Sequence, residues 1–189
     1  MKAEYFAGLD LGQSQDYTAL GVIERREGRA LRLRYLERMA LGTPYTEVVE
    51  RVRRAMRSRS LVGERHLVVD ATGVGRAVVE LLKKAELGCR VWPVLITGSG
   101  AAAVRRGVYR VPKRELIVGL QGLLERGELQ IAAGLGAGGA LVREMAEMRV
   151  RVTDKGHEQF GVWRHGEHDD LVLAVALGCW AVGTKTRSR

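Results

Sequence analysis

Short apolar runs and longer amphipathic stretches alternate along the chain, and this pattern predicts both strands and helices. The apolar runs have the length of buried strands. Residues 31–36 alternate apolar and basic side chains, as a half-exposed strand does. The first three strands follow one another through short polar turns, so we expect them to pair antiparallel. The expected buried strands cover residues 5–11, 19–23, 66–70 and 90–96.

Apolar residues also recur at the spacing of amphipathic helices. One such stretch follows Thr43 and Pro44, which we expect to be the N-cap and the first helical residue. The chain of 189 residues suits one domain with a buried core, spanning residues 1–189. Further helices are expected after Gly75, from Pro112, around 141–148 and from Leu171.

Two of the expected strands end in an acid, Asp10 and Asp70, and the last helix begins directly after Asp169 and Asp170. An acid at a strand end can simply cap a turn, and an aspartate before a helix can simply be its N-cap. Capping accounts poorly for two aspartates in tandem before a fully apolar helix. If both strands lie in one sheet, their acids share an edge, and the helix can bring its first residues there.

Several carboxylates in one place repel each other and raise each other's pKa, and a bound divalent metal removes that cost. Oxygen ligands suit Mg²⁺ or Mn²⁺, and two such ions can activate a water and stabilise the leaving oxygen of a phosphodiester. The sequence therefore predicts a metal-dependent nuclease with two ions. His168 is either a further ligand or a capping or surface histidine.

The net charge is +9, and arginine supplies most of the positive side chains. Such a charge favours a polyanionic partner, although a thermophile-like or GC-rich composition would also explain it. Guanidinium groups suit bidentate contacts to phosphate. We expect the DNA contacts to flank the acidic edge or to lie on a basic hairpin at 150–163 and beside it: Arg105, Arg106, Lys113, Arg151, Lys155 and Arg164.

Other chemistries have little support in the sequence. Cys89 and Cys179 lack the spacing of a zinc site or of a disulfide framework, which agrees with a reducing cytoplasm. No P-loop motif is present. The longest apolar run, Leu171 to Gly183, is too short to cross a bilayer, so no membrane association is expected.

Five motifs occur in an order that is similar to the nuclease domain of the terminase large subunit of tailed bacteriophages. They are 8–12 (GLDLG), 16–19 (DYTA), 68–75 (VVDATGVG), 112–116 (PKREL) and 168–171 (HDDL). The resemblance implies an α/β, RNase H-like (retroviral-integrase-like) fold with a central mixed β-sheet flanked by helices on both faces. It also implies metal-dependent cutting of double-stranded DNA. Asp10, Asp70 and one or both of Asp169 and Asp170 match the metal ligands of that family, and Asp16 matches a nearby acid.

The sequence departs from that family in one respect, because a complete large terminase also carries an ATPase motor. We expect an excised nuclease domain rather than a stand-alone relative, and a monomer when isolated. The resemblance implies that the partners in the full assembly are the ATPase domain, a portal protein and a small terminase subunit, in the host cytoplasm. Cutting with little sequence preference is expected, since nothing resembles a base-reading helix.

Three other interpretations remain open from the sequence. A RuvC-type Holliday-junction resolvase, or another RNase H-like nuclease, would share the metal site and differ in substrate. The Asp-Leu-Gly and Asp-Ala-Thr-Gly segments also resemble nucleotide-binding folds of the actin and sugar-kinase type, but the chain is short for two such lobes. Finally, the protein could be a basic DNA-binding module whose acids are only structural.

Overall fold

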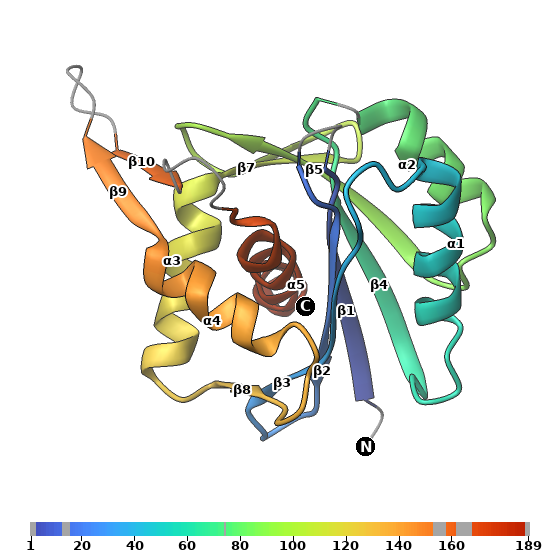
Figure 1. Cartoon of the computed structure of the whole chain (residues 1–189), viewed down its shortest axis with the longest axis horizontal. Helices are drawn as coiled ribbons and strands as arrows, with labels where there is room; N and C mark the ends of the chain where they lie inside the picture. Colours follow the sequence, from blue (N-terminus) through green and yellow to red (C-terminus); the bar gives the residue numbers. More distant parts are fainter. Residues whose placement is uncertain (1–2, 13–15, 74, 153–157, 162–167, 188–189) are drawn as a thin grey trace.

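A mixed sheet of eight strands forms the centre of the part of the chain that the structure describes (Figure 1). The structure is a computed structural model that describes residues 3–12, 16–73, 75–152, 158–161 and 168–187. The strands are arranged in the order β6-β7-β5-β4-β1-β2-β3-β8. They are β1 (Ala3–Asp10), β2 (Ala19–Arg25), β3 (Leu31–Arg38), β4 (Gly63–Asp70), β5 (Arg90–Thr97), β6 (Ala103–Arg105), β7 (Val108–Pro112) and β8 (Leu129–Ile131).

The pairing of the strands agrees with the sequence pattern. β1 pairs antiparallel with β2, and β2 pairs antiparallel with β3, as predicted. On its other side β1 runs parallel to β4, and β4 runs parallel to β5. The segment around Arg105 forms a small hairpin of β6 and β7 at the edge of the sheet. Because β1 and β4 are parallel neighbours, their carboxyl ends meet at one edge.

Helices cover both faces of the sheet, as the resemblance implied (Figure 1). On one face, α1 (Tyr45–Met56) and α2 (Gly75–Lys84) enclose one apolar core. On the other face, α3 (Lys113–Glu125), α4 (Gly138–Glu147) and α5 (Asp170–Arg187) enclose a second core. A separate ladder of β9 (Arg149–Val152) and β10 (Glu158–Gly161) lies beside α3. The predicted α/β fold is confirmed.

Alternation along β1 decides which face each side chain meets. Tyr5, Ala7 and Leu9 pack into the core beneath α1 and α2, whereas Phe6 packs into the core beneath α5. Since side chains on a strand alternate between faces, Asp10 lies on the α5 face with Phe6. The same alternation in β4 places Val68, and therefore Asp70, on the α5 face.

The helix α5 lies directly against the backbone of β1. A Cβ atom on Gly8 would lie 1.9 Å from the carbonyl oxygen of Ala174 in α5, so only glycine fits at this position. A Cβ on Gly178 would similarly lie 3.1 Å from the carbonyl oxygen of Phe6. Residues 170–179 of α5 are all buried, which explains why this helix is apolar on every side. Close packing of α5 fixes where its first residues emerge at the sheet edge.

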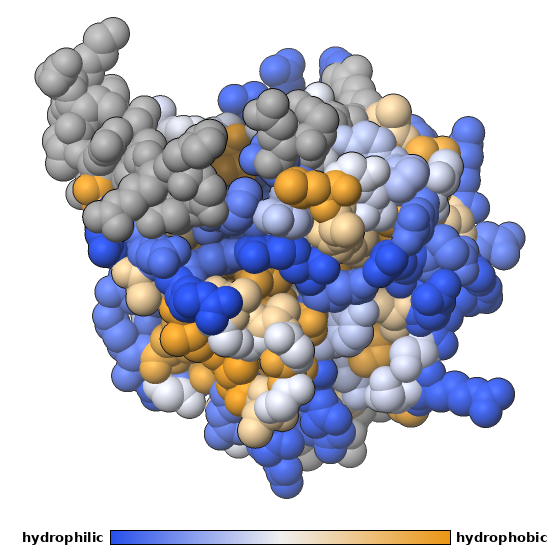
Figure 2. Space-filling view, viewed as in Figure 1, coloured by the Kyte–Doolittle hydropathy of each residue, from blue (hydrophilic) through white to orange (hydrophobic). Residues whose placement is uncertain are grey.

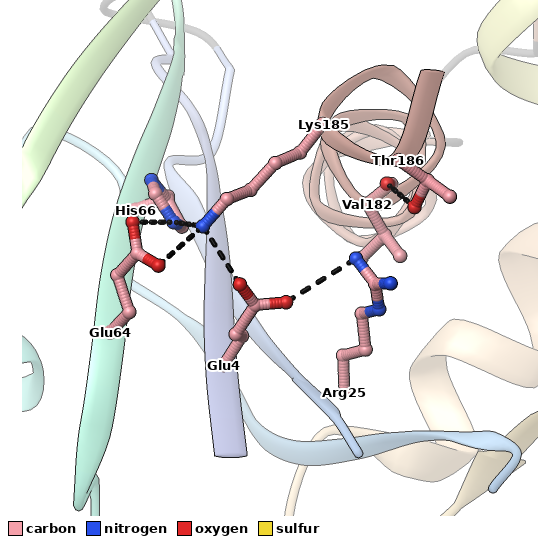
Figure 3. Close-up of polar contacts among 7 residues, drawn as sticks. All are labelled: Glu4, Arg25, Glu64, His66, Val182, Lys185 and Thr186. Carbon is pink, nitrogen blue, oxygen red and sulfur yellow. Dashed lines mark hydrogen bonds and ion pairs between the residues drawn. The ribbon is translucent and has the colours of Figure 1, made fainter. Parts of the chain in front are cut away.

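The carboxyl end of α5 is anchored by a polar cluster (Figure 3). Lys185 Nζ lies 2.8 Å from Glu4 Oε1 and 2.6 Å from Glu64 Oε2, on β1 and β4. It also lies 2.8 Å from Nε2 of His66, whose buried ring stacks on Phe6 at 4.8 Å. Burial and the charge of Lys185 lower the pKa of His66. This cluster ties α5 to the end of the sheet opposite Asp10 and Asp70.

Three predicted helix starts are off by one residue, since α3 begins at Lys113 rather than Pro112 and α5 at Asp170 rather than Leu171. The helix α1 begins at Tyr45, and Pro44 occupies the N-cap position without a side-chain cap. The hydroxyl of Thr43 donates to the carbonyl oxygen of Ala40 at 2.6 Å instead, so Thr43 stabilises the preceding turn. Proline at the N-cap has no side-chain oxygen, and the first amides of α1 therefore lack a local side-chain partner.

Two further sequence expectations concern the cysteines and the membrane. Both cysteines are free, Cys179 buried and Cys89 half-buried, and burial raises the pKa of Cys179 to about 12. Within the described ranges, no helix is long and apolar enough to cross a membrane. Figure 2 shows hydrophobic side chains gathered where α3 and α4 meet the surface. An apolar groove of about 360 Å³ lies there, lined by Ile117, Leu120, Gln121, Leu124, Met145, Met148, Val150 and Val172.

Candidate metal centre

The carboxylates of Asp10 and Asp70 stand at adjoining strand ends. In the parallel pairing of β1 and β4, Leu9 lies opposite Val69, and the two aspartates are the next residues on each strand. Both side chains are partly buried. The Thr72 amide donates to Oδ1 of Asp70 at 2.8 Å, which orients that carboxylate. The predicted meeting of the two acids at one sheet edge is therefore confirmed.

The first residues of α5 arrive at the same edge. Asp170 begins the helix and is buried, while the Asp169 side chain is 22% exposed. Asp70, Asp169 and Asp170 all raise the pKa of Asp10, in addition to the larger effect of its burial, so their charges act on the same place. The pKa of Asp10 lies well above its usual value for these reasons. Burial also raises the pKa of Asp70.

Two cations from other elements compensate the acids of α5. Lys113, the first residue of α3, places its Nζ 2.6 Å from Oδ2 of Asp169. Arg38, the last residue of β3, places Nε 2.8 Å from Oδ2 of Asp170 and donates through a second nitrogen to Oδ1 at 3.2 Å. The Asp170 carboxylate is thus held in a bidentate pair, whereas Asp169 has a single contact with a flexible lysine.

Glu144 of α4 completes this part of the site. Its side chain is buried, forms an ion pair with Arg38 and accepts the Val172 amide of α5 at 3.1 Å. Sequence reasoning missed both Arg38 and Glu144. Arg38 carried a weak signal, because it ends a strand as Asp10 and Asp70 do. Glu144 carried none, since an acid within a short amphipathic helix is usually exposed.

The donor chemistry fits a hard divalent cation, although no complete cage is preformed. Among the described residues, no group of three or more His, Cys, Asp and Glu side chains could hold a metal ion as they stand. Asp169 faces Lys113, and Asp170 faces Arg38. Asp10, by contrast, makes no hydrogen bond or ion pair with the described part of the chain, and a carboxylate buried beside other acids suits Mg²⁺ or Mn²⁺.

Two further ligand candidates from the sequence are Asp16 and His168. Asp16 is exposed. The His168 ring packs edge-on against Tyr17, with ring centroids 4.7 Å apart, and Tyr17 in turn lies under the guanidinium of Arg38 at 5.0 Å. In this structure His168 therefore belongs to a packing cluster around Arg38.

The predicted DNA contacts fall into three groups. Lys113 is partly buried against Asp169. Lys155, Arg164 and the side chain of Arg151 lie outside the described part of the structure. Arg105 and Arg106 are exposed and border a groove of about 580 Å³. The groove is lined by Ala71, Val79, Glu80, Lys83, Pro93, Leu95, Arg105, Arg106, Val108 and Arg110.

This groove lies on the α2 face of the sheet, and Ala71 in its lining directly follows Asp70, whose side chain lies on the α5 face. Its floor is apolar and its rim is basic. Arg105, Arg106 and Arg110 are exposed and have no acidic partner within the described ranges, whereas Lys83 is paired with Glu80 at 2.9 Å. Unpaired arginines on an open groove are available to a polyanion. Arg110 was not among the residues expected from the sequence.

The sheet order, the helices on both faces and the acids at adjoining strand ends define the RNase H-like class. The chain belongs to the family described as the Terminase RNaseH-like domain, whose model matches residues 7–178. The terminase large subunits of Thermus phage G20c and Thermus virus P23-45 are each 27% identical to it over 173 residues. The match covers 92% of this chain but only 30% of the length of those relatives.

Solved structures agree with this family. The crystal structure of the large terminase nuclease from phage G20c with bound magnesium has a TM-score of 0.70 and 26% identity, and the match covers 94% of this chain and 81% of that one. The manganese-soaked human cytomegalovirus terminase nuclease domain has a TM-score of 0.61 at 12% identity, covering 94% of this chain and 81% of that one. The second similarity shows the fold alone, and it is the same RNase H-like fold.

Proposed function

We propose that this chain is the nuclease domain of a viral genome-packaging terminase large subunit and cuts double-stranded DNA in a reaction that needs divalent metal. The observation that carries the proposal is the convergence of Asp10, Asp70 and Asp169 from three elements at one sheet edge. Membership of the terminase family and the magnesium-bound G20c nuclease support the same reaction class.

Asp10, Asp70 and Asp169 would hold Mg²⁺ or Mn²⁺, and two ions fit the charge of the site. Bound ions would supply a water activated for attack and would stabilise the charge on the leaving oxygen. Asp170 stays with Arg38 in this assignment, because a buried bidentate pair is costly to separate. Asp169 is the more available of the two, since its carboxylate is more exposed and has one lysine contact.

The chain's own side chains position the DNA and the acids. Thr72 orients Asp70 through its amide, and Lys113 compensates Asp169 while no metal is bound. Arg105 and Arg106, with Arg110 of the same hairpin, would bind phosphates on the Asp70 side of the scissile bond. Arg151, Lys155 and Arg164 stay proposed DNA contacts, and Asp16 and His168 stay secondary candidates near the metal.

The wider assembly is part of the same proposal. The curated relatives are more than three times as long as the matched region, which leaves room in them for a motor domain. We therefore infer that the 1–189 region acts as one nuclease domain, a monomer when isolated, beside an ATPase domain, a portal protein and a small terminase subunit. Packaging would take place in the host cytoplasm.

A plasmid assay tests the proposed reaction. Supercoiled plasmid is incubated with the protein in EDTA, Mg²⁺ or Mn²⁺, beside Asp70→Asn as the matched variant. The proposal predicts nicking and linearisation with metal only, and a loss of at least about 100-fold in the variant, since Asp70 would be a direct ligand. Metal-independent cutting, or full activity in a folded Asp70→Asn protein, would contradict it.

Substrate preference separates this proposal from a junction resolvase of the same fold. Linear duplex and a four-way junction of equal length and composition are compared under the same metal conditions. We expect similar rates on both, because a packaging nuclease acts on continuous duplex and needs no branched structure. A strong preference for the junction would favour the resolvase.

A further inference from the structure

The first turn of α5 is capped by a side chain of another helix. The Asp169 carbonyl oxygen accepts the Leu173 amide at 2.9 Å, which makes Asp169 the N-cap residue of α5. An N-cap aspartate usually turns its carboxylate back onto an amide two or three residues later, here that of Leu171 or Val172. The Val172 amide instead donates to Oε2 of Glu144 at 3.1 Å. Glu144 of α4 thus takes the acceptor role that the Asp169 side chain would ordinarily have.

Because Glu144 accepts the Val172 amide, the Asp169 carboxylate can face the other acids at the sheet edge. Its Oδ2 lies 2.6 Å from Nζ of Lys113, and its charge acts on Asp10. A carboxylate cannot easily serve its own helix and a site on the sheet edge at once, because capping folds the side chain back over the first turn. The position of Glu144 therefore bears on whether Asp169 is available as a ligand.

Arg38 fixes Glu144 in the capping position. Glu144 is 4% exposed, and a buried carboxylate needs a paired cation. The Arg38 guanidinium supplies it and at the same time holds Asp170, so one side chain joins β3, α4 and α5. Tyr17 packs over the same guanidinium. The capping carboxylate is therefore held on two sides, by Arg38 and by the amide it caps.

We propose that Glu144 is a positioning residue that caps α5 in place of Asp169 and so keeps Asp169 available to bind the metal. The inference rests on the proposed metal site. Without Glu144, the Asp169 carboxylate would turn onto the Val172 amide, and metal binding would have to compete with that hydrogen bond. Groups that orient metal ligands typically change metal affinity by about 10–100-fold when removed.

The test measures Mn²⁺ affinity by isothermal titration calorimetry on the metal-free protein, without DNA. Glu144→Ala removes the cap, whereas Glu144→Gln keeps one oxygen that can accept the Val172 amide and replaces the oxygen that faces Arg38 by an NH2 group. Leu141→Ala, fully buried on the same helix, is the control for a general loss of packing around α4. Thermal unfolding of each variant shows that the protein is folded at the temperature of the titration.

We expect Glu144→Ala to bind Mn²⁺ about tenfold or more weakly, Glu144→Gln to stay within about threefold of the wild type, and Leu141→Ala to match the wild type. Wild-type affinity in Glu144→Ala would overturn the inference and leave the proposed function intact. An equal loss in Glu144→Gln would overturn the capping role, and an equal loss in Leu141→Ala would show a packing effect only. Failure of the wild type to bind Mn²⁺ would overturn the metal site itself.

Discussion

Lys113 Nζ lies 2.6 Å from Oδ2 of Asp169, so in the described structure a protein cation occupies the side of this carboxylate that faces the other acids. Lys113 also lowers the pKa values of Asp10 and Asp70, against the larger effect of burial. The lysine therefore compensates the acidic edge, and in the proposed metal site a metal would have to displace it from Asp169.

Lys113→Met is expected to bind Mn²⁺ more tightly than the wild type when DNA is absent. The variant keeps the length of the side chain and removes the competing charge. A gain of about threefold to tenfold corresponds to about 0.7–1.4 kcal/mol. Calorimetric titration measures it, with Lys83→Met on α2 as the control, because Lys83 pairs with Glu80 and not with the acids of the site among the described residues. Unchanged or weaker Mn²⁺ binding in Lys113→Met would show that Lys113 does not compete with the metal.

Stability of the metal-free protein should depend on pH through Asp10. Its pKa is raised in the folded protein, above the ordinary value of 3.8, so the folded state binds the proton more tightly than the unfolded chain. Between the pKa of Asp10 in the unfolded chain and its raised pKa in the folded protein, the free energy of unfolding falls as pH rises. Above the raised pKa, the full cost of burying the charged carboxylate is present. Acidification into that window should therefore stabilise the metal-free protein.

Asp10→Asn removes the free-energy cost of the buried Asp10 charge. We expect its Tm at neutral pH in EDTA to rise by about 2–4 °C, the shift that about 1 kcal/mol causes in a domain of this size. Differential scanning calorimetry from acid to neutral pH measures both effects, and Asp16→Asn is the control because Asp16 is exposed. A lower Tm in Asp10→Asn, with an unchanged pH profile, would mean that Asp10 carries no charge penalty.

Gly8→Ala tests the contact that places α5 on the sheet. The new Cβ would lie 1.9 Å from the Ala174 carbonyl oxygen, and backbone rather than a flexible side chain would have to move. We expect a loss of about 3 kcal/mol or more in urea unfolding. Gly119→Ala on the exposed side of α3 is the matched control, since no atom lies within 4 Å of its Cβ. That variant should gain about 0.5–1 kcal/mol, because alanine favours the helix.

Arg105→Gln and Arg106→Gln test the proposed DNA path. Each should lower the slope of log binding constant against log salt concentration by about one, if each arginine neutralises one phosphate. Binding of a labelled duplex in EDTA isolates this effect from cleavage. Arg126→Gln is the control, because Arg126 pairs with Glu128 just before β8, at the sheet end away from Asp70. Equal slopes in all three variants would place the DNA elsewhere.

The meeting of Asp10 and Asp70 at one edge of the sheet could be predicted from the sequence for a physical reason. Alternation along a strand fixes the face of each side chain, so the pattern that buries Phe6 and Val68 beneath α5 also directs Asp10 and Asp70 to that face. Parallel pairing then brings the two strand ends together. The buried helix that follows Asp169 was predicted from its apolar length alone, and the resemblance to terminase nucleases added the fold.

The contacts that hold the acids could not be predicted in the same way. Arg38 and Asp170 are 132 residues apart in the chain, and their pairing depends on how α5 packs across β1, β2 and β3. Glu144 meets Arg38 only because α4 packs against the same helix. Such long-range pairs carry no periodic signal, and the sequence therefore left open whether Asp169 or Asp170 is the ligand.

A crystal of the protein soaked in MnCl₂ and measured for the anomalous signal of manganese tests the central claim most directly. The account predicts manganese bound by Asp10 and Asp70, with Asp169 moved from Lys113 onto the metal and Asp170 still paired with Arg38. Manganese bound elsewhere, or none at the edge in crystals whose protein still cuts plasmid, would contradict the claim that these carboxylates form the nuclease site.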